Sequence, residues 1–363
     1  MLNEEKMLHQ PIFFKPNRVL REYLGGKLFA SFFGDDSEDC YFPEEWLCSR
    51  VEAKNDRVVG IRDGVSVIEG TDVFFDDFVS AHKKEMLGDG RETFDVLVKM
   101  LDSAIRLPVQ AHPDKPFSKQ YFHSNFGKTE SWLILDTRPD ACIFFGFKDK
   151  ITKEQFQAAV DKALEADNAD AASAILEPLL NRIPVKRGDT YLIPSKTIHA
   201  IGAGCLLLEV QEPTDFTITP ERYCGDNVLS DEKMYIGLSE DEALDCFDYS
   251  LFGDAAIAHG ALHPTKMNYA DGVVKEAIIT PADTPCFSLN RYTIENSFLS
   301  LPQGPSVILV TDGEGEVICG DMNRKIRKGS YFFLPYCVTD AIIRTDRKIE
   351  VAECLPPELT AAK

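Results

Sequence analysis

The sequence predicts a mainly β protein made of two barrels, with helical segments inserted into the first. Short apolar strands alternate with turns that contain glycine and proline toward both ends of the chain, a pattern typical of barrels. A turn-and-strand motif occurs twice, at 188–194 and at 329–335. Helical apolar spacing is found over 72–105 and over 152–181. With 363 residues, the chain is long enough for two domains.

The first part of the chain combines strands with one helical stretch. Gly25 and Gly26 mark a turn between apolar segments. Within 72–105, FFDDFVSAHKKEM and ETFDVLVKMLDSAI both place apolar residues three and four positions apart, so we expect helices there. Strand character then returns at 107–112, 130–135 and 141–147.

The segment 152–181 is rich in alanine and leucine and opens with a helix-start signal. Thr152 is followed three residues later by Gln155, the spacing of a capping box. We expect two helices here, separated near 166–169, and one further short capped helix at 239–247. The rest of the chain alternates short strands with turns. We therefore place the first domain at 1–245 and the second at 246–363.

The two copies of the repeated motif differ in one chemically important respect. In each copy a glycine lies six residues before a proline. His199 stands five residues beyond the first proline, whereas Asp340 has that offset from the second. The second barrel is therefore expected to have no equivalent metal-binding histidine, and the chain to have one active site. DGEGEVICG, near the second copy, is interpreted as a hairpin, because no helix pattern follows it to support a dinucleotide loop.

Charge and cysteine usage restrict the partners and the compartment. The net charge of −20 disfavours binding to nucleic acid or to an anionic membrane, whereas a few cations in a cleft still suit a sugar phosphate. The ten cysteines include no CxxC pair, and several lie in apolar runs. The amino terminus is charged, and no apolar run reaches membrane-spanning length. We expect a reduced, cytoplasmic protein, either a monomer or a homodimer.

A set of side chains suited to a metal ion lies at strand spacing around 107–134. Gln110 and His112 are two residues apart, so on a strand they share a face, and Lys128 and Glu130 repeat this arrangement. With His199, the donors Gln110, His112, Glu130 and His199 form a mixed nitrogen and oxygen set that suits zinc and leaves a position open. Taken singly, His112 is better explained as a turn residue and Glu130 as half of an ion pair, and it is their joint arrangement that favours a metal site. Gln110 carries a neutral amide, which is a poor metal ligand. It could instead bind the substrate or a bridging water.

These stretches also carry a family resemblance. LPVQAHPD (107–114), GKTESW (127–132) and IPSKTIHAIGAGCLLLEVQ (193–211) resemble the metal-binding blocks of type I mannose-6-phosphate isomerases, a zinc-dependent cupin family. The resemblance implies jelly-roll barrels, one Zn²⁺ per chain and a small-molecule sugar phosphate as partner. It also implies reversible conversion of mannose 6-phosphate to fructose 6-phosphate through a cis-enediol.

The resemblance also implies catalytic residues. Lys128 matches a lysine two before the glutamate ligand, and Glu209 matches approximately a family acid/base glutamate. Arg222 is the candidate for the family's active-site arginine, although that arginine usually follows a Thr-Asp or Ser-Asp pair sooner than Arg222 follows Thr214-Asp215. Lys115 and Lys196 are alternative phosphate contacts.

Two other functions are compatible with the same residues. One is a non-catalytic metal- and sugar-binding cupin that acts as a sensor or an assembly module, which the irregular 214–222 loop favours and the presence of Lys128 and Glu209 disfavours. The other is an iron-dependent cupin oxygenase, a class that generally uses more histidines. Histidine and carboxylate sites also accept iron, manganese or cobalt, so the native metal stays open. His123, in the loop between the expected strands, is a less favoured fifth ligand.

Overall fold

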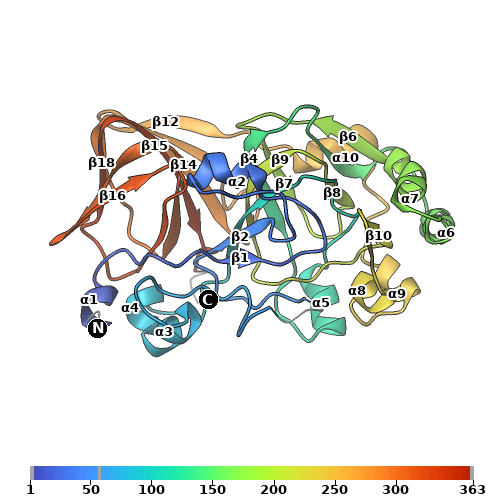
Figure 1. Ribbon diagram of the computed structural model, residues 1–363, viewed down its shortest axis with the longest axis horizontal. Helices are drawn as coiled ribbons and strands as arrows, with labels where there is room; N and C mark the ends of the chain where they lie inside the picture. The colour runs from blue at the N-terminus through green and yellow to red at the C-terminus, as the bar shows by residue number, and fades with distance from the viewer. Residues whose placement is uncertain (1–3, 56–58, 360–363) are drawn as a thin grey trace.

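Antiparallel sheets dominate the computed structural model, which describes residues 4–55 and 59–359 (Figure 1). A six-stranded sheet has the order β1-β2-β3-β9-β4-β7, and smaller sheets are formed by β6-β5-β8 and by β10-β11. These strands are β1 (Arg18–Val19), β2 (Glu44–Leu47), β3 (Leu97–Asp102), β4 (Glu130–Thr137), β5 (Cys142–Phe147), β6 (Leu180–Pro184), β7 (Thr190–Ile193), β8 (His199–Ile201), β9 (Cys205–Gln211), β10 (Tyr223–Cys224) and β11 (Asn227–Val228).

The carboxy-terminal part of the chain forms a seven-stranded sheet, drawn in orange and red in Figure 1. Its order is β12-β13-β14-β18-β15-β16, with β17 also paired to β15. The strands are β12 (Thr265–Ala270), β13 (Val273–Ile279), β14 (Ser288–Ser300), β15 (Ser306–Cys319), β16 (Met322–Arg327), β17 (Tyr331–Leu334) and β18 (Ile342–Leu355). DGEGEVICG lies within β15 and the turn to β16, so the hairpin interpretation is confirmed.

The helices are short and lie around the sheets, with α6 and α7 at the end opposite the seven-stranded sheet (Figure 1). They are α1 (Glu4–Leu8), α2 (Lys27–Phe33), α3 (Phe75–Ala81), α4 (Lys83–Leu87), α5 (Lys115–Tyr121), α6 (Lys153–Leu164), α7 (Ala169–Leu176), α8 (Asp231–Tyr235), α9 (Glu240–Leu244) and α10 (Gly253–Gly260), with a 3-10 turn at Glu177–Leu179. None of the helices within the described residues has both the length and the apolar character needed to cross a bilayer.

The predicted helices over 152–181 are confirmed, together with their start signal. Thr152 caps α6 as part of a capping box with Gln155, and Asn168 caps α7. The apolar faces of both helices enter a core with α8 and α9. The short helix expected at 239–247 is also present as α9, with Ser239 as its cap.

The helical expectation for 72–105 is wrong in its second half. α3 and α4 account for the first half, but Leu97–Asp102 form the buried strand β3 between β2 and β9. All six residues of β3 are buried, because both faces of the sheet are covered. A strand buried on both faces lacks the alternation of a half-exposed strand, so its run of apolar residues resembles that of a helix.

The strand expected at 107–112 is also only partly present. The segment is extended, but it makes isolated bridges instead of a regular ladder: Gln110 pairs with His199, and Ala111 pairs with Ile218. The bridges still place Gln110 and His112 next to β8. The predicted strand at 130–135 is confirmed as β4, which begins at Glu130.

An apolar core joins the six-stranded and the seven-stranded sheets face to face. Leu208 and Val210 of β9 belong to the same cluster of buried side chains as Val307 and Leu309 of β15. The alternate residues of β9, such as Leu207, belong to a second cluster inside the six-stranded sheet. Because side chains alternate along a strand, Glu209 faces this inner side, where the candidate site lies.

Leu208→Ala is expected to lower the free energy of unfolding by about 2–5 kcal/mol, because it leaves a cavity in the core that joins the two sheets. Leu208 is fully buried in this core. Chemical denaturation followed by circular dichroism measures the effect. Leu359→Ala is the matched control, since this leucine is 53% exposed. Equal stability of the two variants would contradict this description of the core.

The two sheets share a strand order and a register. β3-β9-β4-β7 in the first sheet corresponds to β14-β18-β15-β17 in the second. Glu209 lies opposite Trp132 in one, and Glu353 lies opposite Ile308 in the other. The repeated motif at 188–194 and 329–335 coincides with the equivalent strands β7 and β17. The repeat found in the sequence therefore corresponds to a repeat in the fold.

Candidate metal centre

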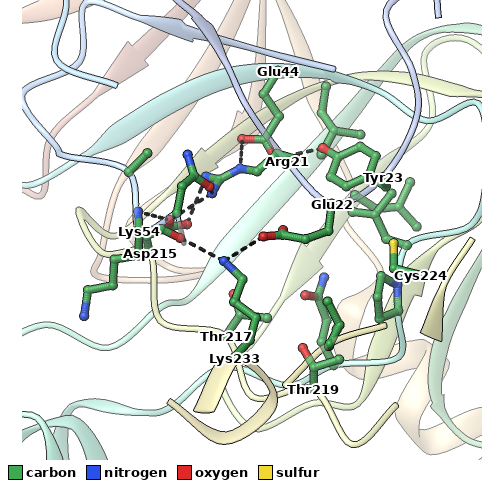
Figure 2. Close-up of a pocket in the computed structure, with 18 of the residues that line it drawn as sticks. Arg21, Glu22, Tyr23, Glu44, Lys54, Asp215, Thr217, Thr219, Cys224 and Lys233 are labelled. Atoms are coloured by element: carbon green, nitrogen blue, oxygen red, sulfur yellow. Dashed lines mark hydrogen bonds and ion pairs between the residues drawn. The ribbon is translucent and has the colours of Figure 1, made fainter. Parts of the chain in front are cut away.

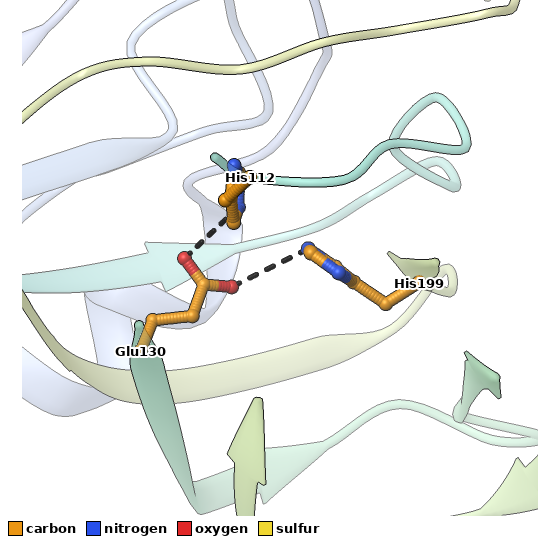
Figure 3. Close-up of side chains that lie close together, drawn as sticks. All are labelled: His112, Glu130 and His199. Atoms are coloured by element: carbon orange, nitrogen blue, oxygen red, sulfur yellow. Dashed lines mark ion pairs between the residues drawn. The ribbon is translucent and has the colours of Figure 1, made fainter. Parts of the chain in front are cut away.

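Three buried side chains from distant parts of the chain converge on one point (Figure 3). His112 follows the bridged segment at Gln110–Ala111, Glu130 begins β4, and His199 begins β8. The potential ligand atoms of the three residues all lie within 4.8 Å of one another. His112 Nε2 is 3.1 Å from Glu130 Oε2, and His199 Nε2 is 3.5 Å from Glu130 Oε1. No other group of this kind occurs among the described residues.

Main-chain carbonyl groups orient both imidazole rings. His112 Nδ1 is 2.9 Å from the carbonyl oxygen of Phe216, and His199 Nδ1 is 2.8 Å from that of Thr197. A carbonyl oxygen only accepts hydrogen bonds, so each Nδ1 carries the proton. The lone pair of each Nε2 therefore faces Glu130, which is the tautomer that binds a metal ion.

The protonation states also suit a cation. Burial, followed by the charge of Lys128, lowers the pKa of His112 to about 3, and burial lowers the pKa of His199. Burial opposes ionisation of Glu130, but the charge of Lys128 and then His112 lower the pKa of its carboxyl well below the usual value. At neutral pH the site therefore presents two neutral imidazoles and one carboxylate.

The cluster has the unmet bonding capacity that a metal ion would fill. His199 Nε2 is buried without a hydrogen-bond partner, and Glu130 Oε2 has no hydrogen bond beyond its ion pair with Lys128. Burying a polar atom without a partner costs free energy unless a bound ligand interacts with it. A mixed set of imidazole and carboxylate donors suits zinc and other first-row divalent ions, so these residues fit the metal centre that the sequence predicts.

Gln110 and Lys128 lie beside these donors. Gln110 exchanges two main-chain hydrogen bonds with His199, each of 2.9 Å, and it is one of the residues that line the adjoining cavity. Lys128 Nζ is 2.9 Å from His112 Nε2 and 3.1 Å from Glu130 Oε2. The structure thus brings His112, Glu130, His199 and Lys128 together, and it places Gln110 beside them through its main-chain pairing with His199. His123, by contrast, is exposed and lies outside the cluster.

A cavity of about 480 Å³ opens beside the cluster, and Gln110, Lys128, Glu130 and Glu209 all line it. Glu209 Oε1 is 3.0 Å from Lys99 Nζ, and both side chains are buried. Burial, followed by the charge of Glu130, raises the pKa of Glu209 to about 7. A carboxyl group with such a pKa exchanges a proton near neutral pH, as a general acid or base requires.

The structure does not bring Arg222 into this cavity. Its guanidinium group is paired with Asp231 at 2.6 Å, and Arg222 is not among the lining residues. The alternatives Lys115 and Lys196 also lie outside the lining, and Lys115 is 3.4 Å from Glu212. Thr219 and Cys224, on either side of Arg222 in the chain, do line the cavity, but the Arg222 guanidinium group is bound to Asp231 instead.

A buried guanidinium group that the sequence interpretation missed lines the cavity instead. Arg21 Nε is 3.0 Å from Glu44, and Arg21 Nη1 and Nη2 are 3.1 and 3.2 Å from the two oxygens of Asp215 (Figure 2). Burial opposes ionisation of both carboxyl groups, but Arg21 and then Lys99 lower the pKa of Glu44 and of Asp215 to about 2. Arg21 and Asp215 are 194 residues apart, so no local pattern signals the pair.

Comparisons with known proteins agree with this arrangement. No family model matches the chain. Mannose-6-phosphate isomerase ManA of Bacillus subtilis is 27% identical over 335 residues, which cover 91% of this chain and 94% of the relative. A probable mannose-6-phosphate isomerase of the same organism, GmuF, is 30% identical over 253 residues, which cover 68% of this chain and 70% of the relative. A mannose-6-phosphate isomerase of Streptococcus mutans is 26% identical over 328 residues, covering 90% of this chain and 92% of the relative.

Solved structures share the fold. The crystal structure of the mannose 6-phosphate isomerase of Bacillus subtilis superposes with a TM-score of 0.74 at 22% identity, covering 94% of this chain and 99% of that one. A mannose 6-phosphate isomerase bound with zinc and yttrium superposes with a TM-score of 0.71 at 13% identity, covering 96% of this chain and 100% of that one. The fold is thus common to nearly the whole of these chains.

Proposed function

Because the chain belongs to the mannose-6-phosphate isomerase family, we propose that it interconverts mannose 6-phosphate and fructose 6-phosphate. The observation that carries this proposal is the buried set of two neutral imidazoles and one carboxylate beside a cavity of about 480 Å³. A cavity of that size accepts a small sugar phosphate. The chain is on this basis an aldose–ketose isomerase.

We propose one Zn²⁺ per chain, held by His112, Glu130 and His199, with Gln110 as the fourth ligand. The two imidazoles and the carboxylate form the one cluster of potential metal ligands among the described residues. When bound, the ion acts as a Lewis acid toward the oxygens on C1 and C2 of the sugar. Gln110 is proposed as the fourth ligand because it lines the same cavity and its main chain pairs with that of His199.

The isomerisation moves a proton between C1 and C2 by way of a cis-enediol. Glu209 is proposed to carry this proton, because its pKa of about 7 lets it accept and return a proton at neutral pH. Lys99, 3.0 Å from Glu209, holds the carboxylate in place and offsets its charge. Lys128 is placed to donate hydrogen bonds to sugar oxygens beside the metal ligands.

The repeated strand order supports two cupin barrels, a catalytic one within 1–245 and a second within 246–363. In the second sheet, Ser306 holds the register position of Glu130, since each lies opposite the last residue of its partner strand. Asp340, at the position equivalent to His199, is exposed. A second barrel without ligands leaves one active site per chain, whether the protein is a monomer or a homodimer.

The location in the cytoplasm stays a prediction that the cysteines support. All ten are free in the structure, and most are buried. Unpaired cysteines are usual in a reducing compartment.

The proposed activity is tested with protein that has been stripped with a chelator and then reloaded with zinc. A coupled assay follows fructose 6-phosphate formed from mannose 6-phosphate, and metal analysis counts the bound ion. We expect loss of turnover on stripping, about one zinc per chain on reloading, and recovery of turnover. Stoichiometric zinc without turnover would contradict the isomerase proposal and favour a non-catalytic metal- and sugar-binding cupin.

Arg222→Gln is expected to leave kcat/KM within about threefold of the wild-type value, because the side chain forms a surface ion pair with Asp231 and neither residue lines the cavity. Steady-state kinetics with mannose 6-phosphate measures this. A loss of tenfold or more would return Arg222 to the active site and would require the 214–222 loop to rearrange when substrate binds.

A further inference from the structure

Among the described residues, five cationic side chains line the cavity, and four of them are neutralised by carboxylates. A phosphate dianion gains most from a cation whose charge is not already compensated. The exception is Lys54: no described carboxylate forms an ion pair with it, and its Nζ lies 4.4 Å from the centre of the Phe216 ring. The neutralised cations and their partners are Arg21 with Glu44 and Asp215, Lys99 with Glu209, Lys128 with Glu130, and Lys233 with Glu22.

The main chain of Lys54 is held on both sides by other residues of the cavity wall (Figure 2). Its amide donates a 3.0 Å hydrogen bond to Asp215 Oδ2, and its carbonyl oxygen accepts a 2.9 Å hydrogen bond from Lys233 Nζ. Arg21 in turn fixes Asp215 through two further hydrogen bonds. The backbone is therefore anchored by polar contacts from two distant segments, while the side chain is exposed and no described carboxylate pairs with its charge.

This arrangement suits a contact to the substrate's phosphate. The reacting carbons C1 and C2 must lie near the buried cluster, so the phosphate on C6, at the other end of the sugar, reaches the exposed rim. We propose that the Lys54 ammonium group binds this phosphate and thereby selects phosphorylated sugars. Anchoring of the Lys54 backbone reduces the conformational entropy that is lost when the phosphate binds. The inference rests on the proposed isomerase function.

Lys54→Gln tests the assignment, with Lys150→Gln as the matched control. Lys150 is exposed and lies outside the cavity lining. In Lys54→Gln we expect KM for mannose 6-phosphate to rise roughly tenfold or more and kcat to stay within about threefold. Lys54→Arg keeps the charge and is expected to retain most of the affinity. Lys150→Gln is expected to match the wild type.

Inorganic phosphate gives a second readout, as a competitive inhibitor of the zinc-loaded enzyme. Its inhibition constant is expected to rise in Lys54→Gln in the same proportion as KM, and added salt should weaken inhibition in the wild type because Lys54 is exposed. An unchanged KM and unchanged phosphate inhibition in Lys54→Gln, with an active wild type, would overturn the assignment alone. An inactive zinc-loaded wild type would instead overturn the proposed function, and calorimetric titration of phosphate into both proteins would still decide the role of Lys54.

Discussion

Replacing His199 with alanine is expected to remove the bound metal and to reduce kcat by roughly 1000-fold or more. The side chain is fully buried, its Nδ1 is bound to the carbonyl oxygen of Thr197, and its Nε2 has no protein hydrogen-bond partner. Alanine therefore removes one of the three strong donors found in the described part of the chain. Metal analysis after dialysis and the coupled isomerase assay measure the two effects.

A matched histidine separates loss of the ligand from any general effect of losing an imidazole. His259 is exposed on α10 and lies outside the cluster, so His259→Ala is expected to keep both metal and activity. Circular dichroism of both variants checks that the fold is retained. If His199→Ala kept a full complement of zinc and normal kcat, the metal centre would have to lie elsewhere.

The sequence predicted the metal cluster better than it predicted the cavity around it. Glu130 and His199 each stand at the start of a strand, and strand spacing together with the family-like blocks around them pointed to these positions. The cavity wall, by contrast, depends on pairs such as Arg21 and Asp215 that lie far apart in the chain. An ion pair of this kind leaves no periodic pattern in the sequence, so only the folded chain reveals it.

The misassigned strand β3 illustrates the same limit. LVKMLD has no alternation because one face packs on the core between the sheets and the other faces the cavity side. Lys99 therefore lay in a segment expected to be helical, and its pairing with Glu209 could not be foreseen. The mainly β character was predictable because turns and the repeated motif are local signals. The strands that adjoin the site could not be predicted from the sequence, because long-range packing sets the order of strands in a sheet.

Glu209→Gln is expected to reduce kcat by about 10²- to 10⁴-fold while the zinc content stays unchanged. Glutamine keeps the size and much of the polarity of the side chain but has no proton to exchange near pH 7. Glu209 lines the cavity, and its raised pKa arises first from burial and then from the charge of Glu130. The coupled assay and metal analysis on the same preparation measure the two quantities.

The repeat in the fold supplies a control for this change. Glu353 occupies the equivalent register position in the seven-stranded sheet, is equally buried, and accepts hydrogen bonds from Asn290 and Tyr292. It does not line the cavity, so Glu353→Gln is expected to leave kcat unchanged. A carboxylate needed only for packing would make the two variants alike. Loss of activity in Glu209→Gln alone would mean that the position acquires its catalytic role from Lys99, Glu130 and the cavity, features that the second sheet lacks.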